Sequence, residues 1–87
     1  MTDERRRQRN EIRHLQSESV WLQKALFALR KAETARERLA DVRNEDVSPY
    51  MLPVGDTDLS VEALEDALEH RAKELIQTVR QMRRAIT

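Results

Sequence analysis

The clearest hydrophobic pattern lies in the last third of the chain, where apolar residues recur at steps of three and four. They are Val61, Leu64, Leu68, Ala72, Leu75, Val79, Met82 and Ile86. This spacing puts the side chains on one stripe of an α-helix, as in a coiled-coil seam. Ser60 is suited to cap its start, and Leu59 and Leu64 have the spacing of a hydrophobic staple. We therefore predict a helix over about 60–86.

A longer helix is predicted over about 3–45, because this segment has no proline or glycine and is rich in good helix formers. Its apolar stripe runs through Ile12, Leu15, Leu22, Ala25, Leu26, Leu29, Ala32 and Leu39. Ser17-Glu18-Ser19 is its weakest stretch, since serine side chains compete for backbone hydrogen bonds. An alternative with three helices, over 4–16, 19–45 and 60–86, therefore stays open.

The first helix carries a second apolar set beside this stripe. Its members are Val20, Trp21, Phe27, Ala28, Ala35 and Val42. The combined arc is wider than one partner helix covers, which favours a second chain; partial exposure of Trp21 and Phe27 is the alternative. We expect a homodimer, most simply a four-helix bundle, with six core residues buried, whether the arms pack within a chain or swap. These self-association residues are Leu22, Leu26, Leu29, Leu68, Leu75 and Val79.

All helix-breaking residues fall in one window: Pro49, Pro53 and Gly55 are the only prolines and the only glycine. This predicts a loop over about 46–59. The fold class is then all-α, a single domain over 1–87 built as a long antiparallel helical hairpin. At ~1.5 Å per residue the first arm is the longer one, so its first ~16 residues are expected to overhang as a basic extension.

Composition narrows the class of protein. There is no cysteine, so disulfides and thiolate metal sites are excluded. No apolar run approaches the ~20 residues that span a bilayer, and no apolar signal segment follows the first residues, so we expect no membrane partner and a cytoplasmic protein of a prokaryote or its phage. The formal net charge is zero, from 16 basic and 16 acidic residues, yet folding at the loop gives a basic end and an acidic end.

The start of the chain holds an arginine stripe. Its members are Arg5, Arg6, Arg7, Arg9 and Arg13. Like charges at i,i+4 spacing weaken a helix slightly, so their presence indicates an anionic partner such as nucleic acid, acids of a neighbouring chain, or a solvated end. No recognisable nucleic-acid motif or stacking aromatic accompanies the stripe.

The loop is unusually apolar. Tyr50, Met51 and Leu52 lie between the two prolines, and acids surround them at Asp46, Asp56 and Asp58. Two interpretations stay open: these residues fold back and plug the end of the bundle, or they form an exposed docking tip for a partner protein.

Catalysis and metal binding have little support. No Gly-rich phosphate loop or nucleophile elbow is present. AroQ-type chorismate mutases are also small and open with a long helix, but their buried Arg/Lys and Glu/Gln pattern does not map onto these residues. Asp66, His70 and Glu74 share one helix face, which is typical of a solvated surface when other ligands are missing. We expect no enzyme activity, no cofactor and no metal.

In size and composition the chain resembles small helical proteins of phages and plasmids that inhibit or tether host machinery, although no motif carries the resemblance. The leading hypothesis is a self-associating protein-interaction module that binds or inhibits another protein, with Tyr50, Met51, Leu52, Asp56 and Asp58 as its contact residues. The alternative is a small nucleic-acid-binding regulator that uses the Arg-rich end.

Overall fold

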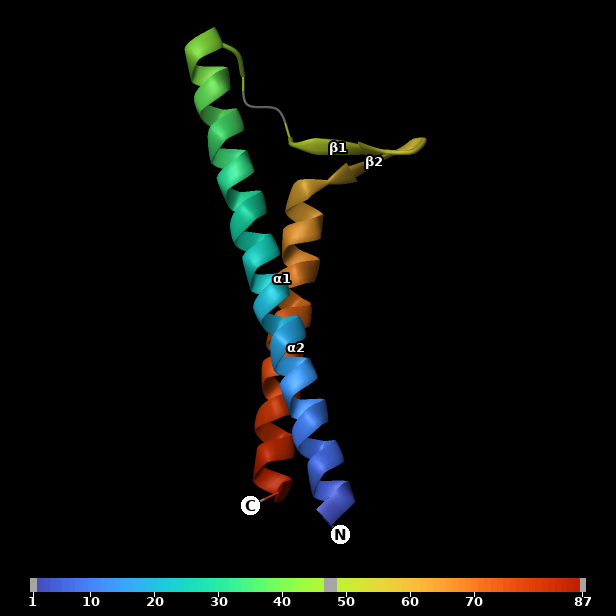
Figure 1. The fold of residues 1–87 in the computed structure, drawn as a ribbon. Coiled ribbons are helices and arrows are strands. Elements are labelled where there is room, and N and C mark those ends of the chain that lie inside the picture. The colour runs from blue at the N-terminus through green and yellow to red at the C-terminus, as the bar shows by residue number, and fades with distance from the viewer. Residues whose placement is uncertain (1, 47–48, 87) are drawn as a thin grey trace.

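The protein is a long helical hairpin. The computed structural model describes residues 2–46 and 49–86, so residues 47 and 48 of the predicted loop lie outside the described residues. The elements are α1 (Thr2–Arg43), β1 (Met51–Val54), β2 (Thr57–Ser60) and α2 (Val61–Ile86). α1 and α2 run antiparallel with both termini at one end, which confirms the predicted hairpin (Figure 1). The longest dimension is 64 Å, close to the ~63 Å that a helix as long as α1 reaches at ~1.5 Å per residue.

α1 is continuous through Ser17-Glu18-Ser19, so the three-helix alternative is wrong. Ser19 is 4 % exposed and lines a small hollow with Ile76 and Val79 of α2. Its hydroxyl accepts a hydrogen bond from Gln23 Nε2 at 3.1 Å. Packing against α2 therefore outweighs the modest helix propensity of serine, and the small side chain fits into the seam between the helices.

α1 ends at Arg43, two residues before the predicted boundary at about residue 45, and Asn44 follows its last turn. Asn44 has φ 55°, the left-handed conformation that follows many helices. The Asn44 N–H donates to Asp41 O at 3.2 Å, and the Glu45 N–H donates to Ala40 O at 2.9 Å. These two bonds form a Schellman motif, which satisfies carbonyl groups that the end of the helix would otherwise leave free.

The connection between the helices is not the irregular loop that we predicted. Residues 51–54 and 57–60 form an antiparallel β-hairpin in which Leu52 pairs with Leu59 and Pro53 with Asp58. Gly55 has φ 61° in its two-residue turn, the left-handed conformation that a tight hairpin requires and that glycine adopts without strain. The expectation of an all-helical chain without any strand pair is therefore wrong at these residues.

The core is the seam between α1 and α2, and it includes the six residues predicted for self-association. Leu26, Leu75 and Val79 are buried, and Leu22, Leu29 and Leu68 are half-buried. Val61, the first residue of α2, is fully buried and Leu75 is 1 % exposed. These side chains thus stabilise a single hairpin, and the half-buried ones leave some apolar surface exposed along the seam.

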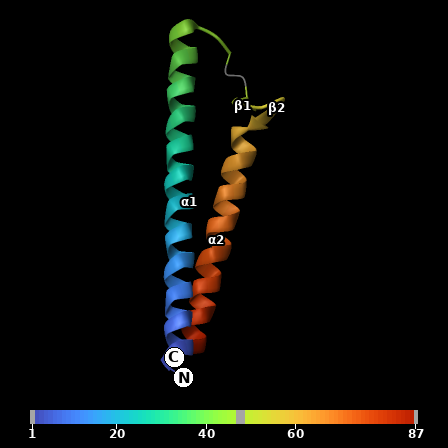
Figure 2. The same ribbon diagram turned by 45° about the vertical axis from the view of Figure 1, so that its right-hand side comes forward.

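The longer helix overhangs at the opposite end from the one expected. Arg9 and Ile12 of α1 line one hollow with Arg83 and Ile86 of α2, and Ile12 is 7 % exposed. The first turns of α1 therefore lie beside the last turns of α2, while the last turns of α1 rise beyond the start of α2 (Figure 2). The connection is long enough to return the chain partway along α1 before α2 begins.

Candidate interaction surfaces

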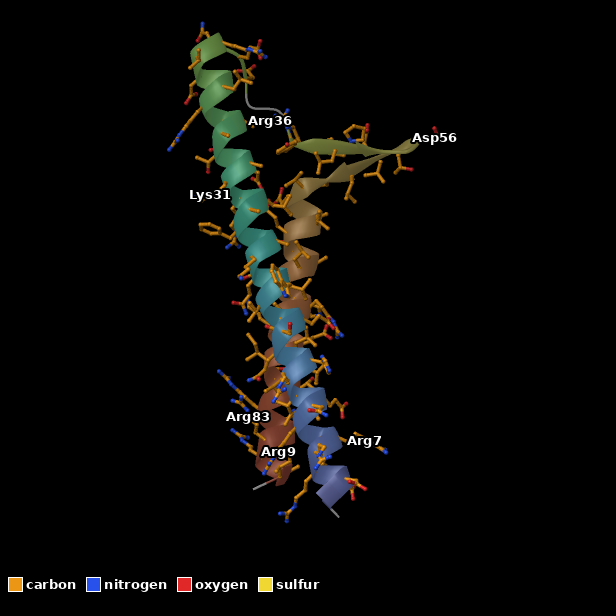
Figure 3. All side chains as sticks on the ribbon, in the orientation of Figure 1. Arg7, Arg9, Lys31, Arg36, Asp56 and Arg83 are labelled. Carbon is orange, nitrogen blue, oxygen red and sulfur yellow. The ribbon has the colours of Figure 1, made fainter. Side chains whose placement is uncertain are left out.

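The β-hairpin is the most prominent projection of the molecule. It extends sideways from the start of α2, away from α1, and Asp56 lies at its far tip (Figure 3). Met51 is 43 % exposed, Val54 58 % and Leu59 39 %. An apolar segment that points into solvent cannot also close the end of the seam. This orientation disfavours the interpretation in which these residues fold back and plug the end of the bundle.

Two contacts anchor the base of the β-hairpin. The Arg36 guanidinium lies 4.8 Å from the centre of the Tyr50 ring, and the Val61 N–H donates to Tyr50 O at 3.0 Å. Tyr50 is half-buried and lines a hollow of about 310 Å³ with Arg36 of α1 and Glu62 of α2. Tyr50 is therefore partly a structural residue, whereas Met51 is an outward one.

The predicted contact residues of the loop come together on this one projection. Met51 and Leu52 lie in β1, Asp58 in β2 and Asp56 in the turn between them. Leu52 is half-buried, and both aspartates are exposed. Asp46 is also exposed but lies before β1, beyond the end of α1. The projection thus offers a small apolar surface with acidic groups at its edge.

The arginine stripe lies on the first turns of α1, and all five of its members are exposed. Arg5, Arg6, Arg9 and Arg13 line a single hollow of about 360 Å³. Because the termini lie together, Arg83 of α2 lies at the same end as Arg7 and Arg9 (Figure 3). The structure thus gathers basic groups from both helices at this end, as predicted from folding the chain at the loop.

A third surface, which we call the outward strip, covers the face of α1 opposite the seam. Its ten residues are all exposed and none is acidic. They are Val20, Trp21, Lys24, Phe27, Ala28, Lys31, Ala35, Arg38, Leu39 and Val42. Trp21 is 64 % exposed and Phe27 62 %, so the sequence correctly marked this arc as apolar surface that one helix does not cover.

Basic residues interleave with the apolar ones on the outward strip, a pattern that we did not predict from the sequence. Lys24 Nζ lies 4.5 Å from the centre of the Trp21 ring, and Lys31 Nζ lies 4.9 Å from the centre of the Phe27 ring. Lys31 points to the side of α1 away from α2 (Figure 3). Listing the charged residues together with the apolar ones by helical angle would have revealed this arrangement.

Glu74, on the same face of α2 as Asp66 and His70, contacts neighbouring side chains through both of its carboxylate oxygens. Glu74 Oε1 lies 2.7 Å from His70 Nε2, and its other oxygen lies 3.5 Å from Arg71 Nη1. Arg71 Nε also contacts Glu18 of α1 at 3.3 Å. Within residues 2–46 and 49–86, no group of three His, Asp or Glu side chains has the arrangement needed to hold a metal ion.

In the described residues, no helix is both long and apolar enough to cross a lipid bilayer. The helical hairpin therefore presents three exposed surfaces: the β-hairpin, the arginine stripe and the outward strip. No protein-family model matches the chain, and searches of curated proteins and of solved structures likewise gave no match.

Proposed function

We propose that this protein is a non-enzymatic interaction module, a small cytoplasmic factor that binds and regulates another protein through its projecting β-hairpin. The observation that supports it is the exposure of Met51, Val54 and Leu59 on a projection that points away from both helices. A connection serving only to join two helices commonly takes 2–8 residues and is polar. Apolar side chains held by a β-ladder lose little entropy on docking, which favours binding.

The test replaces Tyr50, Met51 and Leu52 by serine together. Tagged wild-type protein and the variant are used to capture partners from the native host, and the captured protein is then purified and its affinity for each form is measured. We expect roughly tenfold or greater weakening, with helicity unchanged. Because Tyr50 contacts Arg36, Met51→Ser alone is the matched control that removes no anchoring contact. A loss of several kcal/mol of stability in the triple variant would assign these residues to the fold instead.

We also propose that the protein forms a homodimer. The support is that Leu22, Leu29 and Leu68 of the seam stay only half-buried, because a thin two-helix core leaves apolar surface that a second copy covers in a four-helix arrangement. Leu29→Asp should dissociate the dimer or unfold the hairpin, which sedimentation velocity at micromolar concentration and circular dichroism distinguish. A wild-type protein that is monomeric there and still melts cooperatively would contradict the dimer.

Nucleic-acid binding is the second candidate function, and the hollow lined by Arg5, Arg6, Arg9 and Arg13 favours it. Replacing the five arginines of the stripe by glutamine should abolish such binding, and wild-type affinity for duplex DNA or RNA should fall steeply with salt. The zero net charge opposes strong binding to a polyanion. Sub-micromolar, salt-dependent binding that the glutamines remove would rank this function above protein interaction.

A further inference from the structure

The outward strip has the spacing of a second coiled-coil seam. Trp21, Ala28, Ala35 and Val42 recur at steps of seven, and Lys24, Lys31 and Arg38 lie between them at steps of three and four. The small side chains of Ala28 and Ala35 allow the backbone of another helix to approach closely. Within residues 2–46 and 49–86 nothing covers this face, since all ten residues of the strip are exposed. The spacing therefore suits a helix of another molecule.

A second copy of this chain does not suit the strip. If two strips met antiparallel, with Lys31 of each opposite the other, Lys24 would face Arg38 across the symmetry axis. Shifting the register by about half a heptad places these bases opposite apolar residues instead, and in no register does the strip supply an acid to pair with them. Like charges placed directly opposite each other disfavour association and act against a wrong partner. The occupant must instead bring negative charge.

We propose that the outward strip binds an acidic, amphipathic α-helix of a partner protein. This partner helix presents an apolar residue at about every seventh position and Asp or Glu between them, opposite Lys24, Lys31 and Arg38. The proposal extends the interaction function to a different element, and it rests on that class of function but not on the β-hairpin.

The strip fits a helix better than it fits a nucleic acid. Lysine ammonium groups lie over the rings of Trp21 and Phe27, on the aromatic faces that nucleobases would use for stacking. Ala28, Ala35 and Val42 offer no group that recognises phosphate. A helix with both apolar and acidic residues satisfies every member of the strip, whereas a polyanion satisfies only its bases.

The test uses a synthetic helical peptide with Leu at every seventh position and Glu midway between, and a control peptide with Lys in place of Glu. Binding to the full-length protein is measured by fluorescence anisotropy. We expect the Glu peptide to bind roughly tenfold or more tightly than the Lys peptide. The charge-inverted variant Lys24→Glu/Lys31→Glu/Arg38→Glu should reverse this preference, and it should fold because these side chains are exposed.

Two controls separate this proposal from the others. The variant Arg5→Glu/Arg6→Glu/Arg9→Glu changes the net charge equally but leaves the strip intact, so it should keep the preference for the Glu peptide. The serine variant of the β-hairpin should also keep the preference for the Glu peptide. Failure of the β-hairpin as a docking site can therefore be told apart from failure of the outward strip. The proposal is overturned if the two peptides bind equally, or if a poly-dT strand or an anionic phospholipid vesicle binds the strip more tightly than the Glu peptide.

Discussion

At the scale of the residue, one position of the α2 seam holds a carboxylate. Glu65 lies at coiled-coil spacing between Val61 and Leu68, and its side chain is 12 % exposed. Its Oε2 lies 3.6 Å from Arg30 Nε, while its Oε1 is buried and has no hydrogen-bond partner among the described residues. A half-satisfied buried carboxylate costs stability that a hydrophobic side chain of similar size does not.

Glu65→Leu should therefore stabilise the protein by about 1 kcal/mol, measured by urea denaturation. Arg30 is 57 % exposed and keeps its contact with Glu69 at 3.8 Å, so the substitution leaves no buried unpaired charge. Glu69→Leu is the matched control: Glu69 is 43 % exposed, and little change is expected there. A lower midpoint for Glu65→Leu would mean that the ion pair itself stabilises the seam.

A second residue-scale prediction concerns the start of α2. The Ala63 N–H donates to Ser60 Oγ at 3.2 Å, which confirms the predicted N-cap. Ser60→Ala should cost about 1 kcal/mol because this N–H loses its acceptor. Ser60→Asp restores an acceptor and should recover most of that stability, as judged by thermal unfolding followed by circular dichroism. If Ser60→Asp proved as unstable as Ser60→Ala, the cap would not be the cause.

At the scale of the element, the β-hairpin depends on the turn between its strands. A Cβ atom added to Gly55 would have no neighbouring atom within 4 Å. Any loss of stability on substitution therefore comes from the φ of 61° and not from a steric clash with other residues. Gly55→Ala should destabilise the β-hairpin by about 1 kcal/mol, seen as faster amide exchange in β1 and β2. Asp56→Ala, at the neighbouring turn position without a positive φ, should leave that exchange unchanged.

The sequence predicted both helices well because their patterns are long and periodic, and it missed the β-hairpin for a physical reason. Gly55-Asp56 is a recognised two-residue hairpin turn, but Pro53 lacks the N–H of a ladder donor and argued for a loop. In a two-stranded sheet each strand has an unpaired edge, and such an edge tolerates proline. The short strands also carry no alternation of buried and exposed residues, since β1 and β2 are mostly exposed.

At the scale of the whole molecule, stability rests on a thin seam. Leu75 is 1 % exposed and lies near the middle of α2. Leu75→Ala should cost about 2–5 kcal/mol by removing buried methyl groups and leaving a cavity, which is measured by chemical denaturation. Gln77→Ala, an exposed neighbour, serves as the control and should change stability little. A cost below ~1 kcal/mol at Leu75 would show that the seam collapses around the gap.

The axial register of α2 against α1 is the global feature that could not be predicted from the sequence. The apolar stripes of α1 and α2 both repeat with steps of three and four. Moving α2 by one heptad along α1 therefore still matches apolar residues with apolar residues. The observed register brings together residues far apart in the chain, including Arg30 with Glu65 and Arg71 with Glu18. The fold class was therefore predictable, whereas the end that overhangs and the surfaces left uncovered were not.

The placement of both termini at one end has a mechanical consequence. A force applied between the termini pulls the two helices apart from the turns that hold Ile12 and Ile86. Only the next turn of the seam bears the load at any moment, as in the opening of a zipper. A force applied instead between the start of α1 and the tip of the β-hairpin would load the whole seam in shear. The helices should thus separate at a lower force in the first geometry than in the second.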